Sequence, residues 1–231
     1  MIEKIDSLNP EELIYIDKVL EQGDDLIVFD VGVNEGQHLS IFLSKSIRFK
    51  LYAFEPNDKK YKRLTERFKT NNFVINCLGL DNIVGKKDFY KIRSAFAKFE
   101  GLSSCFFRDV FNRLEYDKVT INCDTIDNYC KNNNIDKIDF LKIDTEGNEL
   151  NIIKGAKELL QNKAIRYIQF EYGLCWKDSK ASIGECIEFL NSFGYKIYQL
   201  DRGKFVELID KKDNYETNTL TNYFVAHEEI K

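Results

Sequence analysis

The chain of 231 residues contains two prolines, two histidines, one methionine and one tryptophan, and these scarcities exclude several classes of protein. The two histidines, with no cysteines spaced C-x-x-C, disfavour a structural zinc site. No apolar run approaches the ~20 residues of a membrane-spanning helix, and the N-terminus lacks a signal peptide's apolar core. The net charge of −4 disfavours nucleic-acid binding. We therefore expect a cytoplasmic protein with no membrane insertion and no nucleic-acid partner.

Six cysteines are present, and in a chain of this length we interpret them as buried thiols rather than as a disulfide framework. Hydrophobic residues make up 43% of the chain and charged residues 31%, which allows a sizeable core. The length fits one large domain or two small ones. Because no linker, repeat or low-complexity tract interrupts the sequence, we expect a single domain over residues 1–231.

Short apolar runs alternate with amphipathic stretches, which predicts parallel βαβ units and a sheet covered on both faces. We expect strands at 26–29, 50–54, 73–78, 138–143, 165–170, 195–200 and 222–227. We expect helices at 9–22, 36–46, 57–70, 124–132, 148–160 and 182–192. Since only a polar loop joins the last two strands, they predict an antiparallel edge. The fold class is therefore α/β, with a doubly wound, mostly parallel seven-stranded sheet.

Three segments flank or interrupt this alternation. Residues 1–25 are expected to form an N-terminal helical flank, in whose helix Leu13, Ile16 and Leu20 share one face. Residues 83–123 contain short β-like pieces and are expected to be an insertion near the active edge of the sheet. Residues 173–231 are expected to supply a C-terminal helix and the closing strands.

Polar residues follow the predicted strands at the points where these strands end. In an open α/β sheet, ligands bind beyond the carboxyl ends of the strands, so we expect these residues to form one site. They are Asp30-Val-Gly-Val-Asn-Glu-Gly36, Glu55-Pro56, Leu80-Asp81, Asp144-Thr-Glu-Gly147 and Glu171.

The first of these loops is rich in glycine but matches neither common phosphate-binding motif. Asn34 breaks the pattern G-x-G-x-x-G, and the lysine of G-x-x-x-x-G-K-[ST] is missing. Gly32 would allow a tight turn and Gly36 a close approach of a ligand. Because Asp30 and Glu35 would repel a pyrophosphate, the loop favours a cationic ligand, such as a sulfonium that also bears an amino group.

Glu55 ends the second predicted strand and admits two interpretations. Its carboxylate can accept hydrogen bonds from a ribose diol, as an acid does about 20 residues after a nucleotide-binding loop. Alternatively, it complements the dipole of the helix that Asn57 caps. The preceding acidic loop favours ribose binding.

These loops, with the segments Gly-Leu-Ser-Ser104, Phe-Leu-Lys-Ile-Asp-Thr-Glu-Gly-Asn-Glu-Leu150 and Ile-Ile-Lys-Gly-Ala156, resemble the FkbM family of S-adenosylmethionine-dependent methyltransferases. The resemblance covers about residues 26–172, and Val33 departs from it, because alanine is usual there. It implies a class I, Rossmann-like methyltransferase fold and O-methylation of a sugar-like acceptor, such as a nucleotide-sugar, a glycan or a polysaccharide precursor.

The resemblance also implies roles for single residues. Asp30, Gly32, Asn34 and Gly36 would line the methionine part of S-adenosylmethionine, and Asp144 would lie beside the methyl donor. Glu55 would hold the ribose hydroxyls, and Leu80 and Asp81 would lie near adenine. Glu146 would face the acceptor.

Methyl transfer to a hydroxyl also requires a group that takes the hydroxyl proton. The candidates are Asp144, Glu146 and Glu171, and His38 is a weaker one. The same three carboxylates can converge on Mg²⁺ or Mn²⁺, since oxygen ligands suit these ions, but nothing in their spacing requires a metal.

Acceptor contacts are expected from Ser103 and Ser104, which are otherwise turn formers, and from Tyr172 and Trp176, which are otherwise hydrophobic anchors. The phenylalanines of the insertion suggest either a lid over the acceptor or a contact in a homo-oligomer. They are Phe96, Phe99, Phe106, Phe107 and Phe111.

Two further basic features are the segment between residues 59 and 69 and Lys142. The lysines and arginines between residues 59 and 69 are read as a solvated helix face, and Lys142 is placed either in the cleft or in an ordinary salt bridge. Methylation of another polar small molecule or of a phosphate-type oxygen stays open. A nicotinamide-dependent oxidoreductase and a non-catalytic scaffold are less favoured alternatives.

Overall fold

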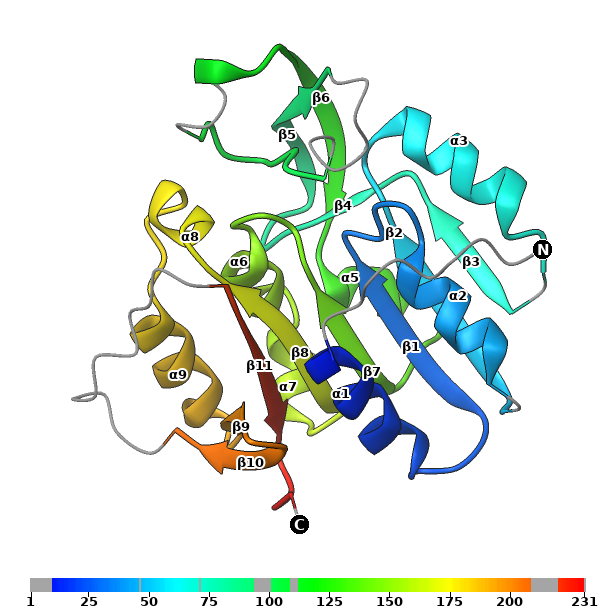
Figure 1. Cartoon of the computed structure of the whole chain (residues 1–231), viewed down its shortest axis with the longest axis vertical. Helices are drawn as coiled ribbons and strands as arrows, with labels where there is room; N and C mark the ends of the chain where they lie inside the picture. Colours follow the sequence, from blue (N-terminus) through cyan, green and yellow to red (C-terminus); the bar gives the residue numbers. More distant parts are fainter. Residues whose placement is uncertain are drawn as a thin grey trace.

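A computed structural model describes residues 10–45, 47–70, 72–93, 101–108, 112–208 and 220–230. Within these residues the main sheet has eight strands in the order β10-β9-β11-β8-β7-β1-β2-β3 (Figure 1). The strands β3, β2, β1, β7 and β8 are parallel, and β11, β9 and β10 pair antiparallel. The strands are β1 Leu26–Val31, β2 Phe49–Phe54, β3 Phe73–Asn76, β7 Ile138–Ile143, β8 Ile165–Tyr172, β9 Lys196–Asp201, β10 Lys204–Glu207 and β11 Thr221–Ala226.

This sheet confirms the mostly parallel α/β fold with an antiparallel edge, but it has one strand more than the predicted seven. The additional strand is β10, which forms a hairpin with β9. Arg202 and Gly203 form the turn of this hairpin, both with positive φ. A four-residue edge strand carries too little alternation to be recognised from the sequence.

Helices cover both faces of the sheet, as predicted for parallel βαβ units. One hydrophobic core contains residues of α1, α2 and α3, and the other contains residues of α5, α6, α7, α8 and α9. None of the helices within the described residues is long and apolar enough to span a bilayer. The helices are α1 Pro10–Leu20, α2 Gln37–Ser44, α3 Asp58–Arg67, α5 Ile126–Asn132, α6 Glu149–Lys154, α7 Lys157–Gln161, α8 Cys175–Asp178 and α9 Ile183–Ser192.

The buried face of α1 agrees with the predicted one at Ile16 and at Leu20, which packs against the core, but not at Leu13. Leu13 is 43% exposed, whereas Tyr15, Ile16 and Val19 are fully buried. The Tyr15 hydroxyl donates a hydrogen bond of 3.0 Å to the backbone oxygen of Asn222, on β11. This contact with the far end of the chain fixes the rotation of the helix, and the helical spacing alone does not reveal it.

Two predicted helix boundaries are also corrected. Thr125, rather than Asp124, caps α5, because its side chain accepts from the backbone N–H of Asn128. The expected helix over 148–160 is divided into α6 and α7 near Gly155. A Cβ at this glycine would lie 2.1 Å from the backbone oxygen of Asp81, so the chain passes closely there.

The predicted insertion forms a separate small sheet with the order β4-β6-β5. Its strands are β4 Gly79–Leu80, β5 Gly85–Ile92 and β6 Tyr116–Asp124, so it begins before residue 83. Figure 1 shows this sheet beyond the main sheet, at the end toward which β1 points. It therefore stands over the edge where the predicted site residues lie.

Candidate active site

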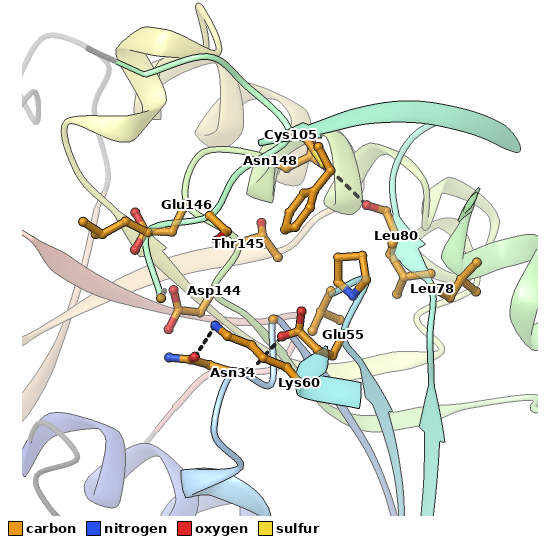
Figure 2. A pocket seen from close by; sticks show the side chains of 18 residues that line it. Asn34, Glu55, Lys60, Leu78, Leu80, Cys105, Asp144, Thr145, Glu146 and Asn148 are labelled. Carbon is orange, nitrogen blue, oxygen red and sulfur yellow. Dashed lines mark hydrogen bonds between the residues drawn. The ribbon is translucent and has the colours of Figure 1, made fainter. Parts of the chain in front are cut away.

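A cavity of about 220 Å³ lies between the small sheet and the carboxyl ends of β1, β2 and β7 (Figure 2). Seven of the predicted site residues line it: Gly32, Asn34, Glu55, Leu80, Ser103, Asp144 and Glu146. The other lining residues are Val31, Pro56, Lys60, Leu78, Gly79, Phe89, Gly101, Leu102, Cys105, Thr145 and Asn148. The predicted loops therefore meet at one cavity, and the small sheet closes it from above.

The parallel pairing of β1 with β2 and β7 brings these loops together. Gly32 N–H donates to the backbone oxygen of Phe54 over 3.0 Å, and Asp144 N–H donates to that of Val31 over 2.9 Å. Gly32 has a φ of 84°, and a Cβ there would lie 1.8 Å from the backbone oxygen of Asp144. Only glycine allows the first loop to pack this closely against the Asp144 backbone.

Glu55 is buried at the cavity wall, with each carboxylate oxygen accepting one backbone N–H. Asn34 donates to it over 3.1 Å and Asn57 over 2.8 Å. Burial raises the pKa of Glu55, and the nearby Lys60 ammonium opposes this rise. Each oxygen of Glu55 retains lone-pair capacity toward the cavity.

Lys60 is a cavity residue that the sequence did not reveal. We expected it on a solvated helix face, but it is only 3% exposed, and its Nζ donates a 2.5 Å hydrogen bond to Oδ1 of Asn34. Lys60, Leu64 and Phe68 follow one another at i, i+4 spacing and are all buried. That spacing places Lys60 on the apolar face of α3, and it is the signal that could have identified the residue.

Asp144, Glu146 and Glu171 form the acidic cluster, whose ligand atoms lie within 4.8 Å of one another. Burial raises the pKa of Glu146 to about 7, although an ion pair of 2.5 Å with Arg108 opposes the rise. Burial, together with the charges of Asp144 and Glu146, raises the pKa of Glu171 well above its ordinary range. Burial therefore disfavours the charged forms of Glu146 and Glu171.

Glu149 holds the loop that carries Asp144 and Glu146. Its buried carboxylate accepts from Thr145 N–H over 2.7 Å, from Thr145 Oγ1 over 2.9 Å and from Gly147 N–H over 3.0 Å. Burial raises the pKa of Glu149, and these backbone donors oppose the rise. Its contribution is thus to fix the backbone of the loop, at which Glu146 has a φ of 57°.

Lys142 lies buried beneath this loop, which resolves its two interpretations in favour of an ion pair at the base of the site. Its Nζ is 3.2 Å from Oδ2 of Asp144 and 4.0 Å from Oδ1 of Asp30. Burial would lower the pKa of Lys142, but the charges of Asp144, Asp30 and Glu12 outweigh burial and raise it. Asp30 does not line the cavity, and both of its carboxylate oxygens lack a hydrogen-bond partner among the described residues. Asp30 is therefore linked to the cavity through Lys142.

Two other predicted cofactor residues lie outside the cavity lining. A Cβ at Gly36 would lie 2.5 Å from the Phe68 ring, so side-chain packing, rather than a ligand, occupies that space. Asp81 is buried and pairs with Lys87 Nζ over 2.5 Å, and it also accepts from the Asn148 amide over 3.2 Å. Asn148 itself lines the cavity beside Leu80.

The four predicted acceptor residues have different positions. Ser103 lines the cavity, whereas Ser104 is buried and donates a 2.8 Å hydrogen bond to the backbone oxygen of Glu146. Tyr172 is 2% exposed and Trp176 is 1% exposed, and their rings pack edge to face at 5.0 Å. Both rings are buried among the described residues, which favours the alternative interpretation of them as hydrophobic anchors.

The remaining candidates lie away from the cavity or outside the described residues. His38 Nε2 is buried 3.4 Å from Oε1 of Glu12, on the α1 side of the sheet. Phe106 lies under the Lys87 ammonium at 4.7 Å, and Phe107 packs edge to face on Tyr90 at 5.5 Å. The other three phenylalanines, Phe96, Phe99 and Phe111, lie outside the described residues.

Strand order, strand direction and this acidic cavity together define a class I, Rossmann-like methyltransferase fold. The family model described as the methyltransferase FkbM domain matches residues 30–197. The chain therefore belongs to the FkbM family of methyltransferases, as the sequence motifs indicated.

Two curated relatives are each 26% identical to this chain. One is the hexuronic acid methyltransferase AglP of Haloferax volcanii, aligned over 71% of this chain and 64% of the relative. The other is the 2-O-methyltransferase NoeI of Sinorhizobium fredii, aligned over 64% of this chain and 63% of the relative. The chain thus spans a little less than two thirds of the length of either relative.

A solved structure of an FkbM methyltransferase from Methylobacillus flagellatus aligns with a TM-score of 0.48 and 15% identity. The alignment covers 88% of this chain and 43% of that one.

Proposed function

We propose that the protein transfers the methyl group of S-adenosylmethionine to a hydroxyl oxygen of a sugar-like acceptor, such as a nucleotide-sugar, a glycan or a polysaccharide precursor. The observation that carries this proposal is the cavity in which Glu55, Asp144 and Glu146 meet at the ends of three adjacent strands. Membership of the FkbM family supports methyl transfer. The name of the hexuronic acid methyltransferase supports a sugar-like acceptor, and the name of the 2-O-methyltransferase supports transfer to an oxygen.

The residues of the cavity fit S-adenosylmethionine, which supplies a methyl group on a sulfonium when it is bound. We assign Glu55 to the ribose hydroxyls, since both of its oxygens can accept further hydrogen bonds. Leu78, Leu80 and Phe89 supply apolar walls suited to adenine. The Gly32–Asn34 loop and Asp144 then remain for the methionine end, where carboxylates favour a cationic group.

We assign proton removal from the acceptor to the acidic cluster of Asp144, Glu146 and Glu171. A general base works best when its pKa lies near the operating pH, and burial brings the pKa of Glu146 to about 7. Ser103, at the cavity wall, is the acceptor contact that we retain from the four expected ones.

Two experiments test the proposal in sequence. Calorimetric titration with S-adenosylmethionine or S-adenosylhomocysteine should give saturable heat, and Glu55→Ala should weaken this binding. A mass-spectrometric screen of nucleotide-sugars and uronic-acid glycans should then find a product heavier by one methylene, with loss of turnover in Asp144→Ala. The absence of binding heat with both S-adenosylmethionine and S-adenosylhomocysteine would refute the proposal.

A metal-assisted form of the same reaction is a second candidate, because the oxygen atoms of the acidic cluster lie within 4.8 Å of one another. Mg²⁺ or Mn²⁺ held there would orient the acceptor hydroxyl and lower its pKa. Loss of turnover in EDTA, restored by added Mg²⁺ or Mn²⁺, would favour this form. Full turnover in EDTA would show that the carboxylates act without a metal ion.

We further propose a cytoplasmic location and a single domain. All six cysteines are free thiols, which suits a reducing compartment. Lys87 of β5 and Ser104, which bridges to Tyr90 of β5, donate hydrogen bonds to Asn148 and Glu146, which supports counting the small sheet with the main sheet as one unit. Equilibrium unfolding with a single transition would agree with this division, and size-exclusion chromatography would test for a homo-oligomer.

A further inference from the structure

The charges around the cavity raise the question of where the anionic part of the cofactor binds. Glu55, Asp144 and Glu146 contribute carboxylates to the lining. Among the described lining residues, Lys60 contributes the one basic side chain. S-adenosylmethionine carries two cationic groups, the sulfonium and the ammonium, and one anionic group, the methionyl carboxylate. Burying that carboxylate in an acidic cavity is unfavourable unless a cation pairs with it.

Lys60 reaches the cavity from the first turn of α3. Its stem is buried on the apolar face of that helix, and its Nζ ends 2.5 Å from Oδ1 of Asn34, on the loop that follows β1. Figure 2 shows the amino group directed away from Glu55, toward Asn34 and the side of the cavity that Asp144 occupies. The ammonium is therefore presented at the end of the cavity that we assign to the methionine part, not at the end assigned to ribose.

We propose that Lys60 binds the carboxylate of the methionyl group and thereby selects cofactors that carry an intact amino-acid tail. The inference rests on the proposed function. The ribose diol is not the partner of Lys60, because the ribose hydroxyls donate their hydrogen bonds to the Glu55 carboxylate. The sulfonium and the ammonium are not partners either, because Lys60 would repel both. An ammonium–carboxylate pair with partial exclusion of water is the favourable combination that remains.

A purely structural role for Lys60 makes a different prediction. If its hydrogen bond to Asn34 merely holds the first loop in place, removal of the ammonium should weaken every nucleoside that occupies the cavity to the same degree. If Lys60 pairs with the carboxylate, only nucleosides that have the carboxylate should bind less tightly. Decarboxylated S-adenosylmethionine keeps the sulfonium, the amine and the nucleoside, and is therefore the probe that separates these roles.

The experiment is a calorimetric titration of the full chain with S-adenosylmethionine and with its decarboxylated form. The wild-type protein should bind the decarboxylated form about 10- to 100-fold more weakly, the range expected for one charge-assisted hydrogen bond. Lys60→Met, which keeps the stem and removes the charge, should weaken the binding of S-adenosylmethionine by a similar factor and should not weaken that of the decarboxylated form, whose cationic groups Lys60 repels. Lys60→Arg should restore most of the discrimination.

Lys59→Met is the matched control, because Lys59 is exposed on the same turn of α3. It should bind both nucleosides like the wild type. Equal wild-type affinity for the two nucleosides would overturn the inference without reliance on any variant. An equal loss of both affinities in Lys60→Met would also overturn it. Failure of the wild type to bind either nucleoside would instead refute the proposed function.

Discussion

Replacement of Glu146 by glutamine should reduce the pH dependence of the stability of the ligand-free protein. In the folded state, burial raises the pKa of Glu146 from 4.5 to about 7, against the ion pair with Arg108. An acid with a raised pKa favours folding while it is protonated. Its contribution to stability is therefore complete below pH 4.5 and is lost as the pH rises through about 7.

The size of this effect follows from the two pKa values. Since one pKa unit corresponds to about 1.4 kcal/mol, the wild type should lose about 3 kcal/mol of unfolding free energy from Glu146 between pH 4.5 and pH 8. At ~2–4 °C per kcal/mol for a chain of this size, this is a change in Tm of about 6–12 °C. Glu146→Gln resembles the protonated side chain, so it should match the wild type near pH 4.5 and exceed it at pH 8.

The measurement is thermal unfolding from pH 4.5 to pH 8 in the absence of nucleoside. The charge of Glu146 also raises the pKa of Glu171. Removal of that charge therefore lowers the electrostatic repulsion on Glu171, which also favours the stability of Glu146→Gln at high pH. Glu66→Gln is the control, because Glu66 is exposed on α3. Parallel Tm curves for the wild type and Glu146→Gln over this pH range would refute the reasoning.

Three further substitutions test how the site is built. Gly32→Ala should lower the free energy of unfolding in urea by more than ~3 kcal/mol, because its Cβ would meet a backbone oxygen at 1.8 Å. Gly203→Ala should lower it less, because a Cβ there, also at positive φ, meets no described residue within 4 Å. Lys142→Met should lower the free energy of unfolding by ~3–5 kcal/mol, because it leaves the buried Asp30 carboxylate without its counter-charge. The second substitution Asp30→Asn should restore part of this loss. Trp176→Ala should lower the free energy of unfolding by ~3–5 kcal/mol and leave the KM for the acceptor unchanged in the fraction that folds. A raised KM for the acceptor would show instead that the ring contacts the substrate.

The sequence predicted the parts of the fold whose signals are local. Buried strands are short apolar runs, and the polar residues after them fall at the same edge because parallel strands end together. This reasoning placed Asn34, Glu55, Asp144 and Glu146 at one cavity without any knowledge of side-chain contacts.

The errors arose where a distant contact decides the outcome. Tyr15 is buried because its hydroxyl reaches Asn222, a separation of 207 residues that helical spacing cannot encode. Tyr172 and Trp176 follow a strand just as the cavity residues do, yet they turn into the core and pack on each other. Lys60 was missed because a charged residue in a basic helix is normally solvated, and only its spacing with Leu64 indicates the buried face.

Both halves of the site depend on the loop from Asp144 to Gly147. Gly32 packs against the backbone of Asp144 on one side. On the other side Ser104, which forms an isolated bridge with Tyr90 of β5, donates to the backbone oxygen of Glu146. Glu149 holds the loop between them, and a Cβ at Gly147 would lie 2.7 Å from the backbone oxygen of Cys175, which leaves no space for the loop to move that way. The hydrogen bond from Ser104 therefore ties the Glu146 backbone to the segment 101–108. The position of the acidic cluster thus depends on contacts from both the first loop and the segment 101–108.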